Sequence, residues 1–242
     1  MTPAADHGRA RGASSAGRAP DHARHLVVAL ALAALALPGA LPGSRGEPDP
    51  VAFLVWIALV AAPVGALAGG SRLPAWPHGA AIPGAWMLVL VAVDALGARD
   101  LDTPLGAALA ASGLFALGFA LGRWLPRART FAVSAVLAGL SASLIFAPVA
   151  GAVLGAPWPG GATARLLDAS PATLLAECAG VDWLRHPAIY DAAGSADIDP
   201  RTRSPYSPVL AAGIVLVLGC MLALFAERSA RARERSSDAP LP

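Results

Sequence analysis

The sequence contains no lysine, asparagine or glutamine, and all 18 of its basic residues are arginine. The missing lysine excludes a P-loop, a retinal Schiff base and a pyridoxal phosphate anchor, and the missing asparagine excludes N-glycosylation. Because lysine and asparagine codons are rich in A and T, we infer a bacterial genome of high GC content. The same codon bias means that abundant alanine and glycine say little about selection.

Cysteine and charge are also scarce. The two cysteines, Cys178 and Cys220, form no CxxC or CxxCH motif, so zinc ribbons and c-type haem are unsupported. Only 14% of the residues are charged and 56% are hydrophobic, whereas about a quarter of a soluble domain is charged. This excess of apolar surface requires lipid, and the composition predicts an all-α, polytopic membrane helix bundle.

Long apolar stretches give the expected number of transmembrane helices, since about 19 residues cross the hydrocarbon core. Five stretches are this long: 51–69, 80–98, 104–122, 131–155 and 208–226. A sixth, residues 26–41, is shorter, and a basic leader precedes it. It is either a retained helix, which we favour, or a cleaved signal peptide. We therefore expect about six transmembrane helices, or five if the first is removed.

The distribution of arginine predicts the orientation, because arginine resists transfer across an energised membrane. The cytoplasmic segments would be 1–25, 70–79, 123–130 and 227–242, and the outer segments would be 42–50, 99–103 and 156–207. The former hold 12 arginines against five acids, and the latter hold six against ten. The chain is predicted to lie in the inner (plasma) membrane with both termini inside. The tails 1–25 and 227–242 lack apolar periodicity and are predicted to be disordered.

Three polar residues within the predicted spans are candidates for function. Asp94 is the only ionisable residue in a span, and an acid in hydrocarbon is often functional. Its position four residues from the outer helix end also fits an interfacial pairing with Arg99. Ser134 and Ser141 lie seven residues apart on one helix face, where they either bond to another helix or line a polar path.

A short internal similarity raises a transporter hypothesis. The stretch APVGALAG at 62–69 resembles APVAGAVLG at 147–155, in two spans of opposite direction. A three-plus-three inverted repeat requires such a pair, although chance similarity is favoured in this composition. GxxxG pairs begin at Gly65, Gly118 and Gly151 and would let helices approach closely, but they are weak matches in so glycine-rich a chain.

The outer segment 156–207, about 50 residues long, contains signals for a short helix. Ser170 and Pro171 are typical of a helix start, with the serine side chain accepting a backbone N–H, and Gly180 is typical of its end. The apolar spacing between them predicts an amphipathic helix that lies on the outer leaflet or caps the bundle. Aromatic and arginine side chains follow, and these often anchor interfaces. We predict that Trp183, Arg185, His186 and Tyr190 dock this segment onto the bundle or onto a partner subunit.

The same segment offers ligand types for a metal in Cys178, Asp182, His186 and Asp191. Pro187 interrupts the helix that would align two of them, and no known zinc spacing is present. Ser195 lacks the GxSxG elbow of a nucleophile. We therefore expect no metal, no cofactor and no catalytic residue.

Three functions remain open. The leading one is a non-enzymatic structural or partner-binding subunit of a membrane assembly. The second is a small transporter or channel, and the third is a metal-dependent enzyme that works at the outer face with His186 and Asp182. The expected partners are the lipid bilayer and a membrane-protein subunit, with no nucleic acid.

Overall fold

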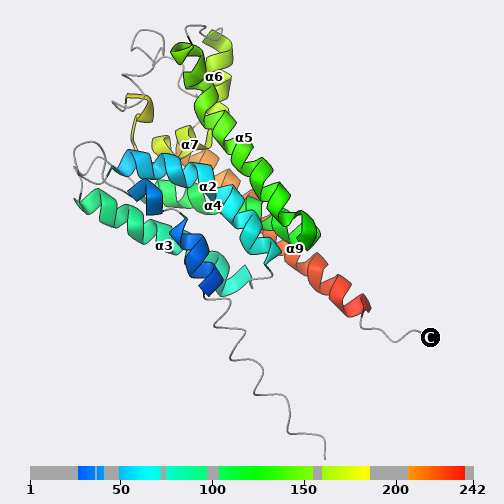
Figure 1. Cartoon of the computed structure of the whole chain (residues 1–242). Helices are drawn as coiled ribbons and strands as arrows, with labels where there is room; N and C mark the ends of the chain where they lie inside the picture. The colour runs from blue at the N-terminus through cyan, green and yellow to red at the C-terminus, as the bar shows by residue number, and fades with distance from the viewer. Residues whose placement is uncertain are drawn as a thin grey trace, which may run out of the picture.

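The computed structural model describes residues 27–35, 37–40, 49–71, 75–96, 104–154, 160–185 and 207–237. All regular structure in this part of the chain is helical, as the sequence predicts (Figure 1). Four of its helices are long and apolar enough to cross a membrane: α2 (Pro50–Gly70), α4 (Pro104–Trp124), α5 (Arg127–Val153) and α9 (Pro208–Ser237). Their length and apolarity indicate a membrane protein.

Further helices complete the described fold. α3 (Ala75–Leu96) contains a shorter apolar stretch, Ala81–Leu96. An unlabelled helix covers residues 27–34, inside the first predicted span. The remaining elements are η1 (Leu37–Ala40), α6 (Gly160–Ala169), α7 (Pro171–Cys178) and η2 (Trp183–Arg185).

The polar ends of several helices extend beyond the predicted spans. α9 continues to Ser237, so the prediction of a disordered tail from residue 227 is wrong as far as residue 237. Alanine, arginine and glutamate are strong helix formers, and Arg231 pairs with Glu227 one turn earlier at 3.1 Å. The predicted N-terminal tail, residues 1–25, lies outside the described residues.

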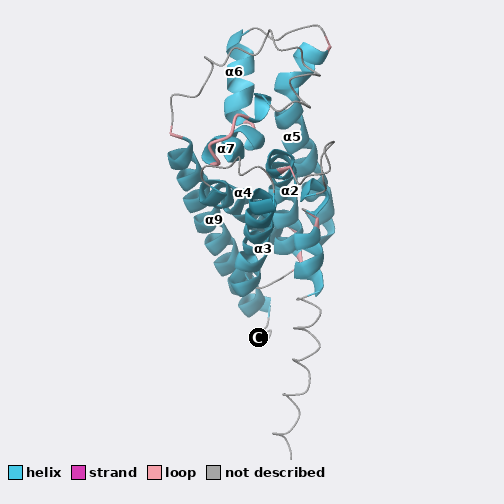
Figure 2. Ribbon diagram, turned by 90° about the vertical axis from the view of Figure 1, so that its left-hand side faces the viewer, coloured by secondary structure: helices cyan, strands magenta, loops and turns pink. Residues whose placement is uncertain are grey.

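α4 is the central helix of the bundle, with α2 and α9 packed along it (Figures 1 and 2). α5 packs on α2, and α3 packs on α2 and α4. Within the apolar stretch of each helix, 61% of α2 and 50% of α4 is buried, against 22% of α5 and 17% of α9. α2 and α4 therefore form the interior, and α5 and α9 form the periphery.

Glycine lets α2 and α4 pack backbone to backbone. Gly118 and Gly122 of α4 lie against the carbonyl groups of Ala62 and Ala66 in α2, and a Cβ atom at either glycine would overlap them. Two glycines of α2 lie against the α4 backbone in return; they are Gly65 and Gly69. Two GxxxG pairs that look like weak matches in the sequence thus form the two sides of one helix interface.

Large apolar side chains cover the outward faces of α5 and α9. On α5 the exposed ones are Phe131, Val136, Leu140 and Phe146. On α9 they are Val209, Leu210, Ile214, Val217, Leu218, Met221, Leu224 and Phe225. A continuous apolar face of this size is expected to contact lipid or another protein.

Candidate functional site

Ser134 joins two helices of the bundle. Its hydroxyl on α5 donates a hydrogen bond to the carbonyl oxygen of Pro63, inside α2, at 3.0 Å. The side chain is buried, and so is that of Ser141, seven residues further along α5. Of the two alternatives for this serine face, the contact of Ser134 favours helix packing over a polar path.

Asp94 lies apart from these serines. It is half-buried on α3, two residues before the last residue of that helix, Leu96. Ser134 instead bonds to α2 at Pro63, which is 13 residues, or roughly 20 Å, from the start of α2. The start of α2 and the end of α3 belong to the same end of the bundle, so Asp94 and Ser134 do not form one site. Arg99, its suggested partner, lies outside the described residues.

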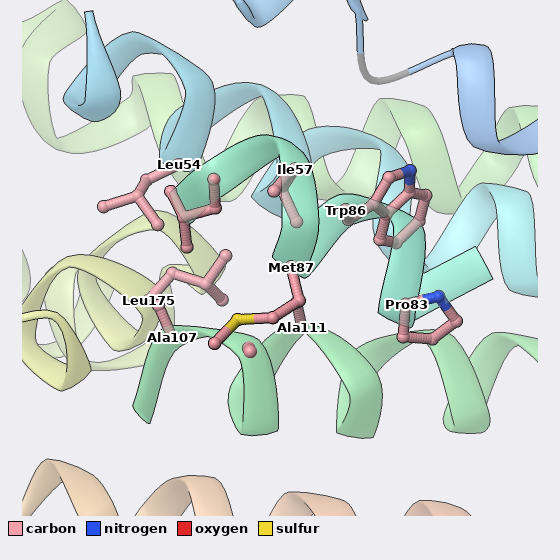
Figure 3. A pocket seen from close by; sticks show the side chains of 10 residues that line it. Leu54, Ile57, Pro83, Trp86, Met87, Ala107, Ala111 and Leu175 are labelled. Atoms are coloured by element: carbon pink, nitrogen blue, oxygen red, sulfur yellow. The ribbon is translucent and has the colours of Figure 1, made fainter. Parts of the chain in front are cut away.

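An apolar pocket lies where α2, α3, α4 and α7 meet (Figure 3). Its lining residues are Leu54, Ile57, Pro83, Trp86, Met87, Leu90, Ala107, Ala108, Ala111 and Leu175. The one polar side-chain group in this lining, the Trp86 indole N–H, donates to the Ala33 carbonyl oxygen at 3.1 Å. The space measures about 10 Å³ for water-sized molecules, enough for one water at most. This pocket is a packing defect rather than a substrate site.

α7 closes one end of the bundle, where it packs against α2, α4 and α9 (Figure 2). Ser170 occupies its N-cap position, but the prediction that its side chain accepts a backbone N–H is wrong. The first turn is instead closed by the backbone, because the Leu174 N–H donates to the Ser170 carbonyl oxygen, and Pro171 fixes the helical φ angle. The Ser170 hydroxyl is buried without a hydrogen-bond partner.

Gly180 ends α7, as the sequence predicts. Its φ angle is 78°, in the left-handed region that glycine adopts without strain. The N–H of Val181 donates to the Ala176 carbonyl at 2.8 Å, and the N–H of Gly180 donates to the Glu177 carbonyl at 3.2 Å. These two bonds form a Schellman motif, which turns the chain sharply out of the helix.

Cys178 links α7 to α9. Its buried thiol donates to the carbonyl oxygen of Pro208, the first residue of α9, at 3.3 Å. Burial, and to a lesser extent the neighbouring Glu177 carboxylate, raise the pKa of Cys178 to about 11. A thiol that keeps its proton at neutral pH is a poor nucleophile and a poor metal ligand, so Cys178 acts here as a structural hydrogen-bond donor.

Trp183 is packed onto the chain itself. The side chain is 2% exposed, and its indole N–H donates to Thr173 Oγ1 of α7 at 3.2 Å. Thr173 belongs to the same outer segment as Trp183, so docking onto the bundle or a partner stays a prediction. The Arg185 side chain, His186 and Tyr190 lie outside the described residues.

The metal hypothesis concerns Cys178, Asp182, His186 and Asp191 of the outer segment 156–207. Among the described side chains, no group of three or more histidine, cysteine, aspartate or glutamate residues could hold a metal ion. His186 and Asp191 of the suggested ligand set lie outside the described residues. Ser195 lies outside them as well.

The end of the bundle opposite α7 holds an ion pair between α4 and α9. Arg123 Nε lies 2.9 Å from Glu227 Oε2, and both side chains are largely buried, with 10% and 12% exposed. The arginine N–H does not point at that oxygen, so the contact is an ion pair rather than a hydrogen bond. The sequence carried one signal for it: each residue directly follows an apolar span, and both spans are predicted to end in the cytoplasm.

The helix contacts do not follow the pattern of an inverted repeat. In such a repeat α2 and α5 would be equivalent and would have similar surroundings. α2 packs along α4 and is mostly buried, whereas α5 packs mainly on α2, with 22% of its apolar stretch buried. This difference disfavours the transporter hypothesis.

The chain matches no family model, no curated protein and no solved structure. A function for this chain therefore has to be argued from its own contacts and surfaces.

Proposed function

We propose that the chain is a multi-pass protein of a bacterial plasma membrane and serves as a non-enzymatic structural or partner-binding subunit of a membrane assembly. In this proposal six helices span the membrane, both termini are cytoplasmic, and residues 156–207 lie outside. The observation that carries it is the contrast between the densely packed pair α2 and α4 and the exposed apolar faces of α5 and α9.

The positions of the helix ends fit the helix directions of the proposed topology. α7, from the predicted outer segment, contacts Gly106 near the start of α4 and Pro208 at the start of α9. Both starts are predicted to lie outside. Arg123 and Glu227, predicted to lie inside, meet at the opposite end. α4 and α9 therefore run in the same direction, as the fourth and sixth spans of an alternating six-span topology would.

Three glycines on the helix surfaces support a partner-binding role. A Cβ atom at Gly84 of α3, Gly139 of α5 or Gly213 of α9 would meet no atom within 4 Å. Glycine destabilises a helix by about 1 kcal/mol relative to alanine. A GC-rich genome encodes alanine as readily as glycine, so codon bias alone does not explain glycine at these positions. Lipid does not require a glycine, but a second helix approaches closely where side chains are small.

The test is the size of the assembly that contains the tagged chain in its own membrane, measured by native electrophoresis in mild detergent. We expect a particle larger than the 24.3 kDa chain with its detergent. Gly139→Leu and Gly213→Leu should shrink this particle without lowering the thermal stability of the isolated chain, because both positions open onto free space.

Gly65→Leu is the matched control, since its side chain would meet the Phe115 carbonyl and should unfold the bundle itself. A wild-type chain that runs as a monomer would contradict the proposal. Leucine variants that keep the full assembly would contradict the surfaces assigned to the partner.

A further inference from the structure

Arginine side chains lie at the end of the bundle opposite α7, where α4 ends, α5 begins and α9 passes beside α4. The pair between Arg123 and Glu227 joins the end of α4 to α9, and α5 begins three residues after α4 ends. Six arginine side chains are described in this region: Arg123, Arg127, Arg129, Arg228, Arg231 and Arg233. We call this group the arginine cluster.

The arginine cluster carries a large excess of positive charge. Glu227 is the one acid among the described side chains of this region, and both of its oxygens are engaged. Oε2 contacts Arg123 at 2.9 Å, and Oε1 accepts a hydrogen bond from Arg231 at 3.1 Å. Six cations and one carboxylate leave a net charge of five. Arg127, Arg129 and Arg228 are exposed, so this charge is accessible at the protein surface.

The start of α5 adds to the attraction for anions. The positive end of the helix dipole lies at Arg127, and the first turn contains no acidic residue. The carbonyl oxygen of Pro126 accepts a hydrogen bond from the Arg129 N–H at 2.9 Å, but the Pro126 side chain cannot accept one from the first two N–H groups of the helix. An anion held by Arg127 and Arg129 would therefore also face the helix N-terminus.

Apolar side chains border the cluster. Trp124, Phe131 and Phe225 are 42%, 77% and 56% exposed, and the rings of Trp124 and Phe225 meet edge to face at 5.8 Å. Tryptophan beside arginine at the end of an apolar helix is typical of the headgroup level of a membrane. A free phosphate ion would gain nothing from this apolar border, whereas acyl chains would cover it.

We propose that the arginine cluster binds the phosphate headgroup of an anionic phospholipid, whose acyl chains lie against Trp124 and Phe131. Each arginine near an anionic membrane surface strengthens binding about fivefold. The cluster would therefore select anionic over zwitterionic lipid around this end of α4 and α5. The proposal requires that the chain lies in a membrane, but it does not depend on a protein partner.

Trp124 provides a local readout. The full-length protein is reconstituted in phosphatidylcholine vesicles in which a minor fraction of the lipid carries brominated acyl chains, which quench a tryptophan on contact. The signal of Trp124 is the difference between the wild-type chain and Trp124→Phe. We expect brominated phosphatidylglycerol to quench it several-fold more than brominated phosphatidylcholine at equal mole fraction. High salt should remove this preference, because the Debye length falls to about 3 Å at 1 M.

Substitution tests the arginines directly. The triple variant Arg127→Gln, Arg129→Gln and Arg228→Gln should lose the preference, with an affinity weakened on the order of 100-fold. The same three positions changed to lysine keep the charge and should keep the preference. Arg165→Gln removes an exposed arginine from α6, beyond the other end of the bundle, and should have no effect.

Equal quenching by the two lipids, insensitivity to salt, or a preference retained in the glutamine variant would overturn the proposal. Loss of the preference on adding inorganic phosphate would show a site for free phosphate instead. If the glutamine variant fails to insert into the vesicles, the dependence of Trp124 quenching on lipid and salt in the wild-type chain still tests the proposal. None of these results bears on the partner role, which is tested by the size of the assembly.

Discussion

The indole N–H of Trp86 in α3 donates a hydrogen bond to the carbonyl oxygen of Ala33, 3.1 Å away at the end of the first helix. Trp56 of α2 donates to the Leu35 carbonyl in the same way. The last carbonyls of a helix lack partners within it, so the two tryptophans satisfy groups that would otherwise be exposed to an apolar environment. The first helix is therefore packed as part of the bundle.

We expect the protein recovered from its own membrane to retain the first helix. Cleavage after the predicted signal region would leave the indoles of Trp56 and Trp86 without acceptors, at a penalty of about 1–3 kcal/mol each. It would also uncover apolar surface around Leu32, which is buried. Mass spectrometry of proteolytic peptides should recover residues 26–40 joined to the rest of the chain. An N-terminus that begins just after residue 40 would show that the segment is a signal peptide.

Trp86→Phe should loosen the first helix without unfolding the bundle. Phenylalanine keeps most of the apolar contact with Phe115, whose ring centroid lies 6.0 Å away, but cannot donate to Ala33. Hydrogen exchange at residues 29–35 should become several-fold faster, in line with the loss of about 1 kcal/mol. Trp183→Phe, which removes the bond to Thr173, should leave exchange at 29–35 unchanged.

Gly118→Ala and Gly139→Ala should have effects of opposite sign on stability. A Cβ atom at Gly118 would overlap the Ala62 carbonyl, so α2 and α4 must separate, and overpacking of this kind costs about 1–3 kcal/mol. Gly139 faces open space, so alanine should stabilise α5 by up to about 1 kcal/mol. Equilibrium unfolding in mixed micelles measures both, and equal effects would contradict the helix interface described here.

Apolar stretches in the sequence predicted the long helices well, because a helix that crosses a bilayer needs a minimum length and an apolar composition, and both can be read from the sequence. The span predicted at 51–69 is observed as Pro50–Gly70, and that at 104–122 as Pro104–Trp124. The ends of α5 and α9 were predicted less well. Helix propensity extends both beyond the apolar stretch, where hydropathy carries no information, and on α9 the pair between Arg231 and Glu227 adds to it.

The contacts between helices could not be predicted from the sequence. All GxxxG pairs look alike in a glycine-rich chain, and only the packed structure shows that Gly118 and Gly65 lie in one interface. The same holds for Arg123 and Glu227, which are far apart in the chain and were counted in the sequence only as topology signals. Pairwise contacts depend on helix rotation and tilt, which neighbouring helices determine.

A double-mutant cycle should show strong coupling between Arg123 and Glu227. Removing Glu227 leaves the Arg123 charge largely buried without compensation, at a penalty of about 3–5 kcal/mol. Removing Arg123 leaves Glu227 with its bond to the exposed Arg231, at a smaller penalty. The double variant Arg123→Gln with Glu227→Gln buries no net charge and should be more stable than either single variant. Additive losses in unfolding free energy would mean that the pair is exposed to water in the folded protein.

Cys178 should react with alkylating reagents far more slowly than an ordinary thiol. In a Cys220→Ala background, a pKa of about 11 leaves roughly one Cys178 thiol in a thousand ionised at pH 8. The iodoacetamide rate should rise about tenfold per pH unit up to pH 10 and level off only near pH 11. Denaturation in SDS should restore an ordinary rate profile, and a plateau near pH 9 in the folded protein would contradict the burial of this thiol.

The raised pKa of Cys178 also predicts how stability depends on pH. Between about pH 9 and pH 11 the unfolded chain releases this proton while the folded chain keeps it, so the free energy of unfolding should fall as the pH rises. Below pH 8 both states are protonated and Cys178 contributes no pH dependence. Because the chain has no lysine, few other groups titrate in this window. Cys178→Ser keeps a donor for the Pro208 carbonyl and should flatten the decline; an unchanged decline would assign it to other groups.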